Sequence, residues 1–146
     1  MSNFIMLVGL PGAGKSTIAQ KLVQEGYVWH STDNIRNELN IHEIERITEV
    51  LDILTSRLLD DMQAGKNIVY DSTNLSRRRR IKVLEQIECF NYKKICYVVD
   101  TDIDTCKERN SHRTGYSKVS DYEYDIMEHH YTKPTYKEGW DEIIYF

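Results

Sequence analysis

The chain of 146 residues is long enough for one domain with a substantial buried core, so its stability does not depend on disulfide bonds. Its three cysteines are odd in number and lack the spacing of a metal site, and no apolar stretch is long enough to cross a membrane. This predicts a cytoplasmic protein with reduced thiols. A formal net charge of −4 argues against sequence-independent coating of nucleic acid, which depends on many contacts from Lys and Arg.

The first element expected in the chain is a buried strand that leads into a phosphate-binding loop. Residues 4–8 form a nearly continuous apolar run, typical of a parallel strand covered on both faces. A complete GxxxxGK[ST] motif follows at residues 9–16, and apolar residues then recur at helical spacing until Gly26. In this context the backbone N–H groups of the loop and the helix N-terminus cradle phosphates. The sequence therefore predicts a site for ATP with Mg²⁺.

The residues of this motif have separate expected tasks. Lys15 is expected to reach the β- and γ-phosphates, and the Ser16 hydroxyl to ligate Mg²⁺. The residues expected to surround the phosphates are Gly12, Ala13, Gly14, Lys15, Ser16 and Thr17.

A second strand is predicted over residues 27–31, and a helix begins directly after it. Asp33 stands at that helix start, where a carboxylate can accept a proton from an attacking hydroxyl. The same position is also explained by simple N-capping, the more frequent task of Asp at a helix start. Arg36 lies one turn further on the same face and is a candidate to hold an anionic group of the acceptor.

Residues 43–64 carry apolar side chains on one stripe and predict a long amphipathic helix closed by Gly65. A third strand over 67–71 then ends in the polar sequence DSTN, and Ser76 is placed to cap a helix that opens with Arg77 to Arg80. Positive charge in the first turn of a helix opposes its macrodipole. Four arginines there suggest an external anion such as a substrate phosphate, although solvation and local ion pairs are expected to explain about two of them, by the usual behaviour of surface charges.

The remaining elements are a strand over 94–100, a helix from about Asp102 to a break near residue 114, a helix over about 120–131 and a strand over 142–146. Arg109 and Arg113 are four residues apart and share one helix face. Beside a phosphate loop they are expected to close over the triphosphate as part of a lid at about residues 109–120. The tyrosines of the last third are better explained by packing and lid contacts than by base stacking; they are Tyr122, Tyr124, Tyr131 and Tyr136.

This alternation of strands and helices predicts a three-layer α/β/α fold with a mainly parallel sheet of four to five strands, a helical lid and one domain over residues 1–146. Ligands of such sheets bind beyond the carboxyl ends of the strands. The informative polar residues are therefore those that directly follow each strand.

Four segments in this order resemble the kinase domain of the bacteriophage-type polynucleotide 5′-hydroxyl kinases, within the small P-loop kinases. They are GLPGAGKST at 9–17, STDNIR at 31–36, DSTNLSRRRR at 71–80 and ERNSHR at 108–113. The resemblance implies transfer of the γ-phosphoryl group of ATP to the 5′-hydroxyl of DNA or RNA. It implies Lys15, Asp33 and Arg113 as catalytic residues, with Asp33 the general base. It also implies Arg36, Thr73 and Asn74 at the acceptor and Arg109 with Arg113 on the donor phosphates.

Two other functions remain open at this point. The first keeps the mechanism but has a nucleoside, a sugar or another small metabolite as acceptor, which the net negative charge favours and the arginine cluster opposes. The second is an ATP-hydrolysing switch protein. The third predicted strand ends in Asp71-Ser72 rather than in an Asp-Glu pair that would activate water, which makes this function the least expected.

Overall fold

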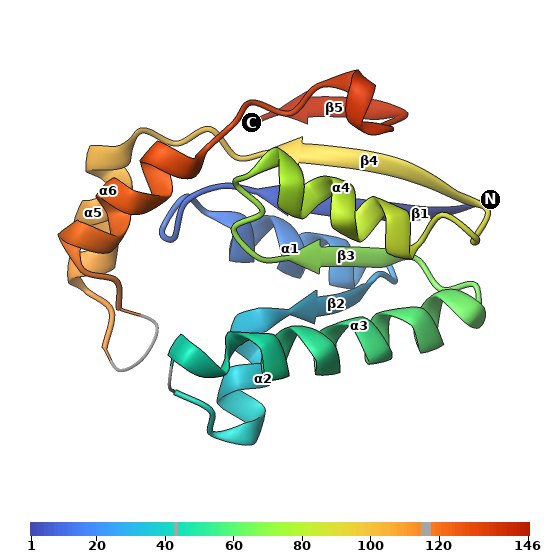
Figure 1. The fold of residues 1–146 in the computed structure, drawn as a ribbon, viewed down its shortest axis with the longest axis horizontal. Helices are drawn as coiled ribbons and strands as arrows, with labels where there is room; N and C mark the ends of the chain where they lie inside the picture. The colour runs from blue at the N-terminus through green and yellow to red at the C-terminus, as the bar shows by residue number, and fades with distance from the viewer. Residues whose placement is uncertain (43, 115–117) are drawn as a thin grey trace.

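A computed structural model describes residues 1–42, 44–114 and 118–146 of the chain (Figure 1). In these segments the strands form one fully parallel sheet in the order β2-β3-β1-β4-β5. The predicted α/β fold with helices on both faces of a parallel sheet is confirmed. The strands are β1 (Ser2–Val8), β2 (Val28–Ser31), β3 (Ile68–Asp71), β4 (Tyr92–Val98) and β5 (Glu142–Tyr145).

Four of the described helices begin where a local side chain caps them. Ser31, Ser76, Asp102 and Ser120 each accept a hydrogen bond from the backbone N–H three residues later. The predicted helix over 43–64 is divided into a short 3₁₀ turn, η1, and α3, and residue 43 lies outside the described residues. The helical elements are α1 (Lys15–Gln24), α2 (Thr32–Leu39), η1 (Ile44–Arg46), α3 (Ile47–Gln63), α4 (Arg77–Gln86), α5 (Ile103–Ser111), α6 (Asp121–His130) and η3 (Tyr136–Glu138).

Strand β1 is the centre of the core because its two faces pack against different helices. Phe4, Met6 and Val8 belong to a large cluster with apolar residues of α3 and α4. Ile5 and Leu7 point the other way and pack against α1. Figure 1 shows the same layers, with α3 and α4 on one face of the sheet and α1 on the other. None of the helices in the described segments combines the length and apolar character needed to span a bilayer.

The parallel register brings the carboxyl ends of the central strands together. Leu7 of β1 lies opposite Asp71 of β3 on one side, and Val8 lies opposite Val98 of β4 on the other. Helices α5 and α6 lie beyond these strand ends (Figure 1). A third apolar cluster, separate from the main core, joins them to the phosphate loop through Ala13, Val99, Cys106 and Tyr124.

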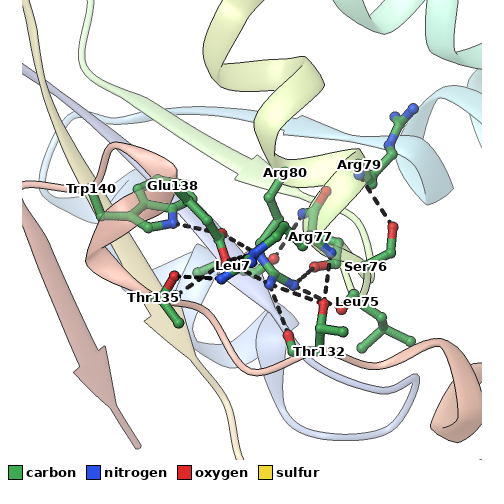
Figure 2. Close-up of polar contacts among 11 residues, drawn as sticks. Leu7, Leu75, Ser76, Arg77, Arg79, Arg80, Thr132, Thr135, Glu138 and Trp140 are labelled. Atoms are coloured by element: carbon green, nitrogen blue, oxygen red, sulfur yellow. Dashed lines mark hydrogen bonds and ion pairs between the residues drawn. The ribbon is translucent and has the colours of Figure 1, made fainter.

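Arg80 is a buried structural residue, and is therefore one of the arginines at 77–80 that a local ion pair explains rather than a substrate phosphate. Its side chain is 0% exposed and donates through Nε and Nη2 to the two carboxylate oxygens of Glu138, at 2.8 and 3.0 Å (Figure 2). The remaining N–H groups donate to the carbonyl oxygens of Asn74, Leu75 and Thr132. All five guanidinium donors are therefore satisfied within the protein.

Arg77 and Arg79 are also engaged with the protein. Arg77 donates to the Thr135 hydroxyl at 2.9 Å, and Arg79 lies 3.3 Å from the Tyr70 hydroxyl. Glu138 in turn accepts from the indole N–H of Trp140. Burial raises the pKa of Glu138, but the hydrogen bonds from Arg80 and Trp140 outweigh it and hold that pKa below its ordinary value. The ion pair thus fastens the segment before β5 to α4.

We predict that Arg80→Met lowers the free energy of unfolding by about 3–5 kcal/mol, because it removes the buried partner of the Glu138 carboxylate and leaves only the more distant, exposed Arg77 guanidinium at 3.6 Å. The matched control is Arg78→Met on the same helix, where the side chain is exposed. Urea denaturation of both variants measures the difference. A loss below about 1 kcal/mol for Arg80→Met would be the size of a surface pair and would contradict the structural role.

Candidate active site

A cleft of about 750 Å³ lies at the carboxyl ends of the strands. It is lined by the phosphate loop, by the residues that follow β2 and β3, and by side chains of α5 and α6. The predicted site residues that line it are Gly12, Ala13, Gly14, Lys15, Ser16, Thr17, Asp33, Arg36, Thr73, Arg109 and Arg113.

The phosphate loop needs glycine at two positions for different reasons. Gly12 and Gly14 both have positive φ angles, 84° and 105°, which residues with a side chain rarely adopt. At Gly12 a Cβ atom would also lie only 2.6 Å from the carbonyl oxygen of Cys106 in α5. Helix α5 and the loop are therefore in direct backbone contact, and a side chain at Gly12 would separate them.

Lys15 turns its ammonium group back onto the loop. Nζ donates to the carbonyl oxygens of Gly9 and Leu10, at 2.9 and 3.1 Å. Burial lowers the pKa of Lys15, and the nearby carboxylates of Asp71 and Asp33 partly offset that effect. A cation with so little hydration is strongly attracted to an anion in the cleft.

Asp71 is a candidate site residue that the sequence reasoning did not select. It ends β3, and its carboxylate accepts a hydrogen bond from the indole N–H of Trp29 at 3.0 Å. Burial raises the pKa of Asp71, although Lys15 and the Trp29 bond pull it down. Its place in the cleft depends on β3 being the neighbour of β1, which a single sequence does not reveal. The polar run after the strand was the one local signal.

Asp33 lies in the first turn of α2 and lines the cleft. The N-cap of this helix is Ser31, whose hydroxyl accepts from the N–H of Asn34 at 3.2 Å. The capping task that competes with a role for Asp33 in catalysis therefore belongs to another residue. Arg36 follows on the same helix, lines the cleft, and donates from Nη1 to the carbonyl oxygen of Ile41 at 3.4 Å.

Asn74 does not line the cleft, in contrast to the acceptor-binding role expected for it. Its side chain is only 2% exposed, and the amide donates to the carbonyl oxygens of Leu7 and Ser72 at 2.8 and 3.1 Å. The residue has a φ of 50°, a conformation that Asn tolerates better than most residues. Together with the bond from the Gly9 N–H to the Thr73 carbonyl oxygen, this amide ties the end of β3 to the start of the phosphate loop.

The two arginines expected in a lid both line the cleft. Arg109 is in the last turn of α5, and its Nη1 donates to the carbonyl oxygen of Gly12 at 3.1 Å. Arg113 follows the helix and is half-buried. Helix α5 ends at Ser111, earlier than the predicted break near residue 114, and α6 begins at Asp121. Residues 115–117 of the expected lid lie outside the described residues.

Comparison with known proteins identifies the family and the fold. A family model described as "AAA domain" matches residues 4–134. No curated protein matches the chain. A candidate kinase from Chloroflexus aurantiacus superimposes with a TM-score of 0.78 at 15% identity, over 99% of this chain and 84% of that one.

Two further solved structures share the fold. The APS kinase CysC of Mycobacterium tuberculosis, in complex with AMPPNP and APS, gives a TM-score of 0.68 at 19% identity, over 99% of this chain and 88% of that one. A chain of the Pnkp1/Rnl/Hen1 complex gives 0.64 at 20% identity, over 77% of this chain and 40% of that one. These identities are low, so the likeness is one of fold.

We predict that Asp71→Asn stabilises the nucleotide-free protein increasingly as the pH rises above 3.8, the ordinary pKa of Asp. Because the folded pKa of Asp71 is raised, its contribution to stability is present below 3.8 and is lost as the pH rises through the folded pKa. The amide keeps an oxygen for the Trp29 bond and removes this loss. Urea denaturation of both proteins at several pH values measures the effect.

Asp102→Asn is the control of opposite sign for this experiment. Hydrogen bonds from the Thr105 hydroxyl and N–H hold the pKa of Asp102 below its ordinary value. Its contribution is therefore present above 3.8 and is lost as the pH falls through the folded pKa. A difference between Asp71→Asn and the wild type that does not change with pH would contradict the raised pKa.

Proposed function

The chain belongs to the AAA domain family, and we propose that it is an ATP-dependent kinase that transfers the γ-phosphoryl group to the 5′-hydroxyl of a polynucleotide, DNA or RNA. The observation that carries this proposal is the position of Asp33 in the same cleft as the phosphate loop, on a helix that is capped by Ser31. A carboxylate in this position serves as the general base for a hydroxyl acceptor.

The donor half of the reaction follows from the phosphate loop and the lid. Loop N–H groups and the Lys15 ammonium bind the β- and γ-phosphates, and Arg109 of α5 and Arg113, just after that helix, add positive charge. The Ser16 hydroxyl and the Asp71 carboxylate supply the oxygen atoms that Mg²⁺ prefers, so the cleft fits this ion. When bound, Mg²⁺ neutralises part of the phosphate charge.

The acceptor half consists of Asp33, Arg36 and the polar residues after β3. Arg36 binds a phosphate next to the reacting sugar, and Thr73 contacts the acceptor from the end of β3. A bond forms between the 5′ oxygen and the γ-phosphorus while the bond from that phosphorus to the bridging oxygen of ADP breaks. The hydroxyl proton passes to Asp33. Each step uses a side chain that lines the cleft.

A second candidate acceptor is a small hydroxylated metabolite with one anionic group. Within the described residues, the arginines that line the cleft are Arg36, Arg109 and Arg113, whereas Arg77 to Arg80 do not line it. The arginine cluster had favoured a polynucleotide, and this argument is weakened. A long polyanion gains affinity from several phosphate contacts, and Arg36 alone supplies one on the acceptor side.

We predict that Asp33→Asn lowers turnover by about 10²–10⁴-fold, the usual contribution of a general base, while ATP affinity changes little. The matched control is Asp52→Asn, an exposed carboxylate on α3. Transfer of labelled phosphate from ATP to a 5′-hydroxyl oligonucleotide measures turnover, and calorimetry measures ATP binding. Normal turnover of Asp33→Asn would remove this residue from the mechanism. Release of phosphate at the same rate without any acceptor would favour the hydrolase function instead.

A second prediction separates the two acceptors through Arg36. If Arg36 binds the phosphate beside the reacting sugar, a nucleoside 3′-monophosphate is a better acceptor than the nucleoside, by about tenfold or more for one charged hydrogen bond. Arg36→Ala abolishes this preference, whereas Arg78→Ala, which changes an exposed side chain outside the cleft, preserves it. Label that appears on anionic sugars or other metabolites but never on an oligonucleotide or nucleotide would establish the second candidate.

A further inference from the structure

Side chains outside the phosphate loop hold its backbone carbonyl oxygens. The Tyr124 hydroxyl donates to the Pro11 carbonyl oxygen at 2.6 Å, and the Thr101 hydroxyl donates to that of Ala13 at 2.7 Å. Arg109 supplies the bond to the intervening Gly12. These donors come from α6, from the segment after β4 and from α5, three parts of the chain that are about 90 or more residues away in sequence.

These bonds orient the N–H groups of the loop as well as its carbonyls. In a planar trans peptide the C=O and N–H groups point in opposite directions. The Pro11 carbonyl points toward α6, so the Gly12 N–H of the same peptide points away from α6. The Ala13 carbonyl points toward Thr101, so the Gly14 N–H points away from Thr101. N–H groups directed into the loop are the groups that bind phosphate oxygens.

Tyr124 is anchored for this task better than a surface residue would be. Its side chain is 0% exposed and packs with Ala13, Val99 and Cys106 in the apolar cluster between the loop and α5. Its hydroxyl also lies 3.3 Å from the carbonyl oxygen of Cys106, so it sits between α5 and the loop. A phenylalanine would fill the same space, so packing alone does not account for the hydroxyl.

We propose that Tyr124 is a positioning residue for triphosphate binding, which fixes the Pro11–Gly12 peptide and thereby couples the position of α6 to the shape of the phosphate loop. The proposal rests on the role of this loop as the ATP site and is independent of the acceptor. Tyr124 touches neither phosphate nor acceptor in this scheme and acts only through the loop backbone.

The test compares Tyr124→Phe with Tyr122→Phe, a change on the same helix where the side chain is 74% exposed. Competition calorimetry with ATP and with inorganic tripolyphosphate is carried out well below the melting temperatures of all variants. Tyr124→Phe lowers the affinity for both ligands by about the same factor, roughly tenfold for one lost hydrogen bond to a buried carbonyl. Tyr122→Phe lowers neither affinity. Tripolyphosphate isolates the contribution of the loop from that of the adenosine.

Two more variants distinguish positioning from a loss of stability. Thr101→Val removes the hydroxyl that donates to the Ala13 carbonyl oxygen and is expected to lower the affinity for tripolyphosphate in the same way. Ile87→Val trims the main core away from the loop, lowers the melting temperature and leaves both affinities unchanged. Affinities of Tyr124→Phe within twofold of the wild type, or an equal loss of affinity in Ile87→Val, would overturn the proposal.

The same measurements separate this proposal from the proposed kinase function. If the wild type binds ATP and Tyr124→Phe shows the expected loss, but no acceptor is phosphorylated, the kinase function fails and the positioning role stands. If the wild type binds neither ATP nor tripolyphosphate, both are overturned.

Discussion

The candidate site depends on bonds between the phosphate loop and distant parts of the chain. The Gly9 N–H donates to the carbonyl oxygen of Thr73, two residues after β3, and the Asn74 amide donates to the carbonyl oxygen of Leu7 near the end of β1. On the opposite side, donors from the β4 end, α5 and α6 hold the carbonyl oxygens of the loop. An anion cradle requires N–H groups that point inward, and the bonds to the loop carbonyl oxygens hold the other side of the same peptides. The loop is therefore shaped by the strand order and by helices α5 and α6 as much as by its own glycines.

The cleft also holds two charged side chains that are poorly solvated, Lys15 and Asp71. Burial lowers the pKa of Lys15 and raises that of Asp71, and so favours the neutral form of each. Groups held in this way reduce the stability of the unliganded protein, which is a common feature of sites that bind charged ligands. Their mutual attraction offsets part of this cost. By contrast, Arg80 and Glu138 form a buried pair whose hydrogen bonds are satisfied within the fold, and this pair organises structure rather than chemistry.

Features that depend on neighbours in sequence could be predicted from the sequence, and features that depend on distant contacts could not. The strands at 27–31, 67–71 and 142–146 were predicted to within one residue of an end because apolar runs mark them. Ser76 caps its helix as predicted, and Asp102 and Ser120, predicted as approximate helix starts, are the N-caps of α5 and α6. The strand expected over 94–100 instead spans Tyr92–Val98, and Val99 packs into the apolar cluster with Ala13 and Tyr124. The burial of Arg80 depends on Glu138, 58 residues later, and the inward turn of Asn74 depends on Leu7, 67 residues earlier. Neither partner can be identified from local spacing.

Acceptor recognition rests on fewer contacts than donor recognition. The loop is tied to the rest of the fold by backbone and side-chain bonds from β3, α5, α6 and the segment after β4, so most changes there would disturb several bonds together. The acceptor side consists of one turn of α2 with Asp33 and Arg36, and of polar residues after β3. At the start of α4, where positive charge opposes the helix dipole, the charge of Arg80 is balanced by Glu138 and by carbonyl oxygens of the chain itself. In the proposed function, Arg36 is therefore the residue that binds the negative charge of an acceptor.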